Sequence, residues 1–72
     1  MAHFEAPIGR TKVYEEIFKS PHGRTTEEEA KKVLDAIRDS HPALYGWKEL
    51  RSGIEQKSDG LFYAWRHHAQ YR

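Results

Sequence analysis

Residues 25–39, TTEEEAKKVLDAIRD, carry the strongest structural signal in this chain of 72 residues. Thr25 or Thr26 can cap a helix, and a glutamate three residues later completes a capping box. The apolar residues that follow stand at positions i, i+3, i+4 and i+7, which is one buried stripe of a helix: Ala30, Val33, Leu34 and Ile37. The segment therefore predicts an amphipathic helix that ends near Asp39, before Pro42.

Residues 54–67 predict a β-hairpin. Two extended runs flank residues 57–60, which end in Asp59-Gly60, a strong turn signal. With a turn of two or four residues, alternation places one set of side chains on a common face, which we assign to the core: Ile54, Leu61, Tyr63 and Trp65. The other face would carry Lys57, Phe62, Ala64, Arg66 and His68. A turn of three residues would reverse this assignment.

Two further segments fit a helix less clearly. In residues 11–19 the apolar residues stand at i, i+1, i+4 and i+5, which clusters them on one helical face, although their types favour strands. In residues 44–52, a short third helix would turn Leu44, Trp47 and Leu50 inward, with Gly46 weakening it. The alternative makes residues 44–52 a strand followed by the hairpin.

Composition bounds the chain to one small domain. We expect a flexible N-terminal arm at residues 1–10, a single domain at 11–67 and a C-terminal tail at 68–72. The chain has no cysteine, which excludes disulfides and thiolate metal sites. No apolar run approaches the roughly 20 residues of a membrane span, and the N-terminus lacks the features of a signal peptide. We therefore expect a cytoplasmic protein that does not enter a membrane.

The order helix, helix, short helix and hairpin resembles a winged helix-turn-helix domain over roughly residues 10–67. The similarity is carried by Thr25–Ala30 at the start of the second helix, by Trp47–Ile54 at the end of a recognition helix, and by Asp59–Tyr63 at the wing. The expected fold is α+β, with two or three helices followed by a C-terminal β-hairpin. The alternative is a helix packed on a small antiparallel sheet.

The resemblance implies binding of double-stranded DNA through the third helix and the wing. In such a domain Lys48 and Glu49 would lie on the groove-reading face, where they match guanine and cytosine edges. The candidate nucleic-acid-binding residues are Arg24, Tyr45, Lys48, Glu49, Lys57, Phe62 and Arg66. The net charge of only +1 counts against this function. The alternative is a protein-interaction module that docks on a larger complex through the exposed aromatic and basic face of the hairpin.

Catalytic and metal-binding patterns are not evident in the sequence. The three acidic residues 27–29 fit the first turn of a helix, where they favour its dipole. No two of the five histidines have the i, i+4 spacing of a zinc site, and His67 and His68 would point to opposite faces of a strand. The sequence therefore predicts a protein that is not an enzyme and uses no metal or cofactor.

Overall fold

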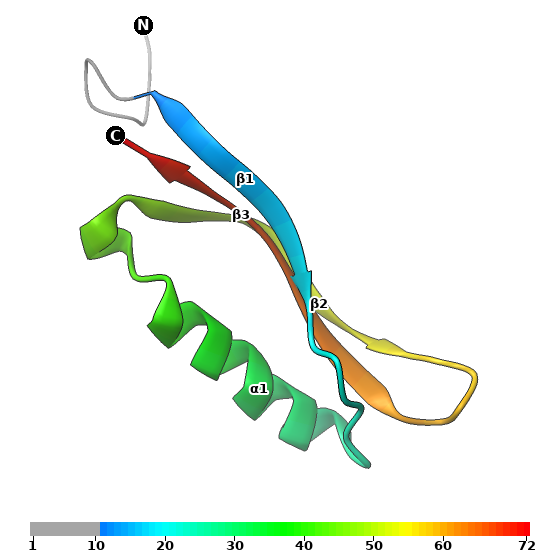
Figure 1. The fold of residues 1–72 in the computed structure, drawn as a ribbon. Helices are drawn as coiled ribbons and strands as arrows, with labels where there is room; N and C mark the ends of the chain where they lie inside the picture. The colour runs from blue at the N-terminus through cyan, green and yellow to red at the C-terminus, as the bar shows by residue number, and fades with distance from the viewer. Residues whose placement is uncertain (1–10) are drawn as a thin grey trace, which may run out of the picture.

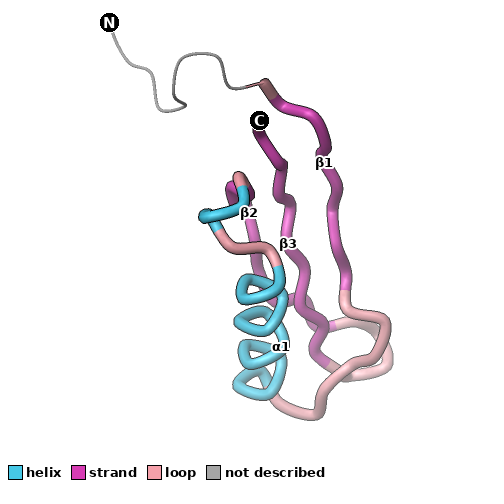
Figure 2. The backbone as a smooth tube through the Cα atoms, turned by 60° about the vertical axis from the view of Figure 1, so that its left-hand side comes forward, coloured by secondary structure: helices cyan, strands magenta, loops and turns pink. Residues whose placement is uncertain are grey.

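Residues 11–72 are described by a computed structural model, and they form one helix and one three-stranded sheet. The elements are β1 (Lys12–Lys19), α1 (Glu27–Ser40), a short 3₁₀ helix η1 (Ala43–Tyr45), β2 (Trp47–Gln56) and β3 (Phe62–Tyr71). The sheet is antiparallel in the order β1-β3-β2, so the last strand lies in the middle. α1 lies along one face of this sheet, as Figures 1 and 2 show.

The predicted winged-helix architecture is wrong. Residues 12–19 are a strand instead of a helix, and residues 47–56 are a strand instead of a third helix, so a single α-helix remains within the described part of the chain. The stated alternative, a helix packed on a small antiparallel sheet, fits the structure. Residues 68–71, expected in a tail, belong to the central strand β3. The predicted arm at residues 1–10 lies outside the described residues.

The predicted amphipathic helix is confirmed as α1. Thr26 is its N-cap, and the Thr26 hydroxyl accepts a hydrogen bond of 3.1 Å from the Glu29 backbone N–H. Ala30, Leu34 and Ile37 are buried on the side that faces the sheet. α1 is therefore fixed by local signals that do not depend on the rest of the fold.

The predicted hairpin is present, but the faces of its second strand are reversed, whereas Ile54 lies on the core side as predicted. The Gly60 N–H donates to the Lys57 carbonyl at 2.9 Å and the Lys57 N–H donates to the Leu61 carbonyl at 3.0 Å, so the turn holds the three residues 58–60. Gly60 has a φ of 81°, the left-handed conformation that such a turn needs. An odd turn length inverts the pairing, and Ile54 faces Ala64 instead of Tyr63 or Trp65.

The core lies between α1 and the sheet. Leu34, Ile37 and Ala64 are buried, and three partly buried side chains pack against them: Phe18, Val33 and Ile54. Trp65, predicted to belong to the core, is on the opposite face of β3 from Ala64 and is partly buried. No helix within residues 11–72 is long and apolar enough to cross a membrane.

Candidate binding surface

The seven residues predicted to bind nucleic acid do not share one surface. Arg66 is 4% exposed and lies on the face of β3 that α1 covers. Glu49, on the same face of the sheet, hydrogen-bonds to Arg38 of α1. Both residues therefore belong to the packing of the helix on the sheet and are not presented for groove readout.

The other predicted residues are more accessible but are scattered. Tyr45 is 67% exposed in η1, and Lys48 is exposed on the face of β2 that α1 does not cover. Lys57 is exposed at the start of the hairpin turn. Arg24 and Phe62 are joined by an isolated backbone bridge beyond the end of β1. Only part of the predicted set thus remains available to a partner.

No other helix or strand among residues 11–72 covers the face of the sheet opposite α1 (Figure 1), although Ala69 on this face is fully buried. The strand register assigns the side chains of this surface, which we name the open face: Lys12, Glu15, Ile17 and Lys19 of β1; Lys48, Arg51, Gly53 and Glu55 of β2; and Tyr63, Trp65, His67, Ala69 and Tyr71 of β3. Ile17 keeps 58% of its surface exposed. Ile17 is the cross-strand partner of His67, so an apolar side chain lies exposed beside a ring on this surface.

Three aromatic rings form a row on the open face along the central strand. Trp65 lies across β2 at Gly53, where an added Cβ would come within 2.9 Å of the indole Nε1. Tyr63 lies against Gly23 in the same manner, with its Cζ 2.8 Å from an added Cβ. The glycines therefore allow both rings to rest on the backbone, and His67 continues the row.

A cation accompanies each ring of this row. Lys57 Nζ is 4.3 Å from the centre of the Tyr63 ring. Lys19 is the cross-strand partner of Trp65 on β1, and Arg51 is the cross-strand partner of His67 on β2. Each ring of the row therefore has one basic residue beside it, while the remaining cross-strand partners are uncharged or acidic: Ile17, Gly53 and Glu55.

The strands of the open face carry fewer acidic than basic side chains, and one of the acidic side chains, Glu15, is already hydrogen-bonded. Glu15 accepts from Lys12 at 2.7 Å and lies 2.5 Å from His67 Nε2. Hydrogen bonds from Lys12 and His67 hold the pKa of the Glu15 carboxyl below its usual value. Glu55 is the other carboxylate of this face. Four cations, Lys12, Lys19, Lys48 and Arg51, thus outnumber two carboxylates on the strands of this face.

An ion-pair network lies on the side of the sheet that α1 covers. Glu49 contacts Arg38 Nε at 2.7 Å and Arg66 Nε at 3.2 Å, and it accepts from the Ser52 hydroxyl at 2.8 Å. The hydrogen bonds from Arg38 lower the pKa of Glu49 to about 2. Burial lowers the pKa of Arg66, whose Nε and Nη1 have no hydrogen-bond partner among the described residues. Glu49 is therefore the counter-ion of a buried guanidinium group.

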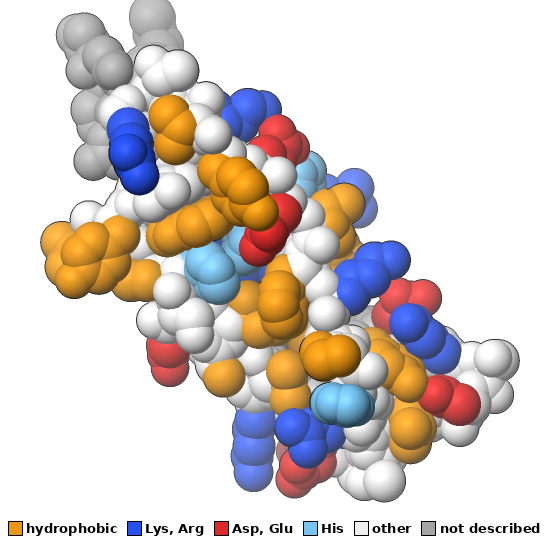
Figure 3. Space-filling view, viewed as in Figure 1, with side chains coloured by type: hydrophobic (Ala, Val, Ile, Leu, Met, Phe, Trp, Pro, Cys, Tyr) orange, Lys and Arg blue, Asp and Glu red, His pale blue; other side chains and the backbone are white. Residues whose placement is uncertain are grey.

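A second polar cluster lies further along the same side of the sheet, at the end of α1. Glu16, His41 and His68 come together there, and His68 Nε2 is 3.0 Å from Glu16 Oε2. Trp47 packs against both imidazoles, with ring centres 4.6 Å from His41 and 4.7 Å from His68. Histidine side chains lie among apolar ones beside an acidic group along the seam between α1 and β1 (Figure 3).

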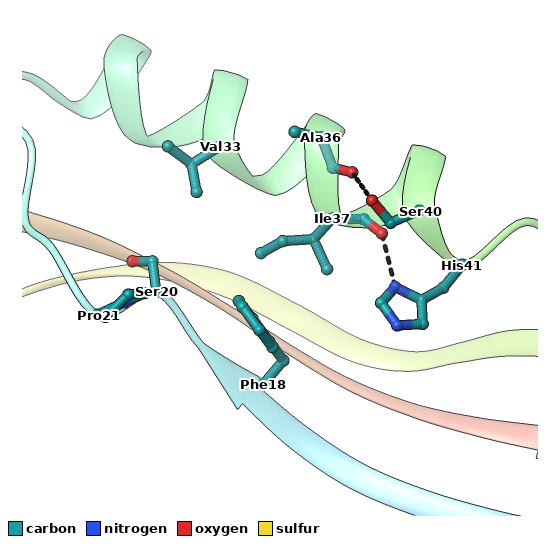
Figure 4. A pocket seen from close by; sticks show the side chains of 8 residues that line it. All are labelled: Phe18, Ser20, Pro21, Val33, Ala36, Ile37, Ser40 and His41. Atoms are coloured by element: carbon teal, nitrogen blue, oxygen red, sulfur yellow. Dashed lines mark hydrogen bonds between the residues drawn. The ribbon is translucent and has the colours of Figure 1, made fainter.

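An apolar pocket of about 240 Å³ opens next to this cluster, between α1 and β1. Figure 4 shows Val33 and Ile37 directed from the helix towards Phe18, with the His41 ring at one end of the pocket. The Ser40 hydroxyl donates to the Ala36 carbonyl at 3.1 Å, which turns it away from the pocket. The pocket therefore offers apolar walls and one imidazole.

Sequence reasoning missed Glu16, His41 and His68 as a group, because they are brought together by strand register and helix packing. Local spacing carried no signal for them, although the placement of His67 and His68 on opposite faces was predicted and is confirmed by the strand register. Searches for related proteins add no further constraint: no protein-family model, curated protein or solved structure matches this chain.

Proposed function

We propose that this domain is a non-catalytic binding module whose open face takes single-stranded nucleic acid. The observation that carries the proposal is the row of Tyr63, Trp65 and His67, each accompanied by a cation. Bases stack on aromatic side chains that lie on a sheet, while lysine and arginine contact the phosphates between them.

The charge of the open face favours a polyanion over a second copy of the chain. In a dimer joined through this face, only Glu55 and Glu15, which is already hydrogen-bonded to Lys12, could pair with Lys19, Lys48 and Arg51 of the other copy. A phosphate backbone would instead neutralise them. Binding of duplex DNA through a third helix is not proposed, because the residues assigned to that helix form β2.

The proposal is tested by fluorescence anisotropy with a labelled mixed-sequence single strand of about 12 nucleotides, in RNA and DNA form, at two salt concentrations. Trp65→Leu keeps an apolar cover over Gly53 but removes the stacking ring. Stacking contributes about 1–3 kcal/mol for each base, so this variant should bind roughly 5- to 150-fold more weakly. Trp65→Phe, which retains a ring, should recover most of the affinity.

A charge-matched pair of variants separates this surface from general electrostatic attraction. Lys19→Ala/Arg51→Ala removes two cations from the open face and should lower the salt slope by roughly 1.4, or about 0.7 for each phosphate contact. Lys31→Ala/Lys32→Ala removes two exposed cations from α1 and should leave the slope unchanged. Equal losses in both pairs, or no binding by the parent at low salt, would refute the nucleic-acid proposal. Self-association that Ile17→Lys abolishes would instead assign the open face to a protein contact.

A further inference from the structure

Three separate parts of the chain meet on the side of the sheet opposite the open face. Glu16 lies in β1, His41 directly follows α1 and His68 lies in β3. One potential ligand atom of each lies within 4.8 Å of the others. We propose that these three side chains bind a divalent transition-metal ion of the zinc class. The proposal is independent of nucleic-acid binding, because it uses none of the rings or cations of the open face.

His41 is held in the form that a metal ion requires. Its Nδ1 is 3.0 Å from the Ile37 carbonyl oxygen, which can only accept, so Nδ1 carries the proton. Nε2 therefore keeps its lone pair, and it lies on the side of the ring away from the helix (Figure 4). In a metal-binding histidine, the N–H of the other ring nitrogen commonly donates a hydrogen bond to a backbone carbonyl in this way.

His68 is the second nitrogen ligand, and its surroundings are unusual for a histidine that only packs. The side chain is fully buried, with 0% of its surface exposed. Nε2 contacts Glu16, but Nδ1 has no hydrogen-bond partner among the described residues. Because Nε2 is the nitrogen beside Glu16, it is the atom that would coordinate an ion together with the carboxylate.

Glu16 completes the set with an oriented carboxylate. The Tyr14 hydroxyl donates to Glu16 Oε1 at 2.6 Å, which leaves Oε2 on the side of His68. Such outer contacts fix the direction of a ligand and are a regular feature of metal sites. Two of the three ligands are thus oriented by a hydrogen bond to a second group: His41 by the Ile37 carbonyl and Glu16 by the Tyr14 hydroxyl.

The ligand types select the class of ion. Two imidazoles and one carboxylate suit zinc and its neighbours in the first transition row, whereas calcium and magnesium prefer oxygen ligands alone. Bonds of about 2.0–2.1 Å in a tetrahedral site place ligand atoms roughly 3.3 Å apart. The Glu16 to His68 contact of 3.0 Å is already close to this value, and a ligand atom of His41 lies within 4.8 Å of both partners. The fourth position would be taken by water from the pocket that His41 lines.

A metal ion at this point would join the end of α1 to β1 and β3, so binding should stabilise the fold. The experiment uses the full chain without a histidine tag, stripped with a chelator and titrated with Zn²⁺ by calorimetry. We expect one equivalent to bind, and we expect the thermal midpoint to rise by roughly 10 °C or more at a hundredfold excess over Kd. Mg²⁺ and Ca²⁺ should produce no shift. Trp47, which packs on both imidazoles, provides a fluorescence signal for the same titration.

The chain contains its own matched control for this experiment. Glu15 and His67 form a carboxylate–imidazole pair in the same two strands, one residue away and on the opposite face. Glu16→Gln/His41→Gln should weaken Zn²⁺ binding at least tenfold, whereas Glu15→Gln/His67→Gln should change it less than twofold.

Each variant is compared with and without metal, so a loss of intrinsic stability does not affect the comparison. Glu16→Gln alone, which keeps the length of the side chain, gives a second test if the double variant unfolds. The proposal is overturned if Zn²⁺ at 100-fold excess over the protein neither binds nor raises the thermal midpoint of the parent. It is also overturned if the Glu15/His67 control loses binding as strongly as the Glu16/His41 variant.

Discussion

Glu49→Gln removes one negative charge from beneath α1 while keeping the shape of the side chain. The parent carboxylate accepts hydrogen bonds from Arg38 and Ser52 and lies 3.2 Å from the buried Arg66. Arg66, which is 4% exposed in the parent, loses its counter-ion in the variant. The amide nitrogen of the new glutamine, which can only donate hydrogen bonds, would also face the donors Arg38 and Ser52.

The size of the effect follows from the pKa of Glu49. Its fall from 4.5 to about 2 corresponds to about 3 kcal/mol of folding stability, at about 1.4 kcal/mol for each pH unit. The Glu49 side chain keeps 30% of its surface exposed, and solvent screening reduces this to about 2 kcal/mol. Removal of one partner of a fully buried ion pair costs about 3–5 kcal/mol. We therefore expect a loss of about 2–3 kcal/mol, most of the stability of about 3–5 kcal/mol that a domain this small has.

Urea unfolding of parent and variant across pH 2–7 measures this difference. Because the pKa of Glu49 is lower in the folded state, its contribution is fully present above about pH 4.5 and is lost as the pH falls towards 2. The other carboxyl groups with lowered pKa, Glu15, Glu16 and Asp59, act alike in both proteins. The difference in the free energy of unfolding between parent and variant should therefore disappear at low pH.

The double variant Glu49→Gln/Arg66→Met serves as the control. It removes both charges, and it should be more stable than Glu49→Gln alone because no unpaired guanidinium group remains buried. A difference below about 1 kcal/mol at pH 7, or a gap that stays constant from pH 7 to pH 2, would refute the assignment of Glu49 as the counter-ion of Arg66.

Two further predictions concern local structure. Thr26→Ala removes the acceptor for the Glu29 N–H and should cost about 1 kcal/mol, measured by urea unfolding, with Thr26→Ser retaining stability. Gly46→Ala and Gly60→Ala both place a side chain at a positive φ, but only at Gly46 would the added Cβ collide with the Tyr71 carbonyl oxygen. Gly60→Ala should cost about 1–2 kcal/mol and Gly46→Ala clearly more, so equal thermal midpoints would contradict the packing of Gly46.

The parts of the fold that were predicted depend on local chemistry. The cap at Thr26 and the apolar stripe of α1 are set by neighbours in sequence, and both are confirmed. The hairpin was predicted from Asp59-Gly60. The side chains that face α1, however, depend on whether the turn has an even or an odd number of residues. The three-residue turn placed Arg66 and His68 beneath α1 and left Trp65 on the open face.

The two strands predicted as helices show why periodicity was misleading. A β-bulge at Leu50 adds a residue to β2, so its α1-facing residues Trp47, Glu49, Ser52 and Ile54 are spaced by two, three and two. Such mixed spacing resembles that of a short helix. In β1, Glu15 and Glu16 interrupt both faces of the strand, because each contacts a histidine of β3. Those contacts, like the candidate metal site, span more than 50 residues of sequence and leave no local pattern.

The central position of β3 determines the order in which the domain can assemble. β3 follows both of its neighbours in the chain, so no strand pairing can form during synthesis until β3 has left the ribosome. α1 and the β2–β3 hairpin then close short loops, whereas contacts such as Glu15 to His67 close one of 52 residues. We therefore expect β1 to be the last strand to dock. In that order of assembly, the Lys12–Lys19 segment would stay unpaired while the hairpin and α1 are already in contact.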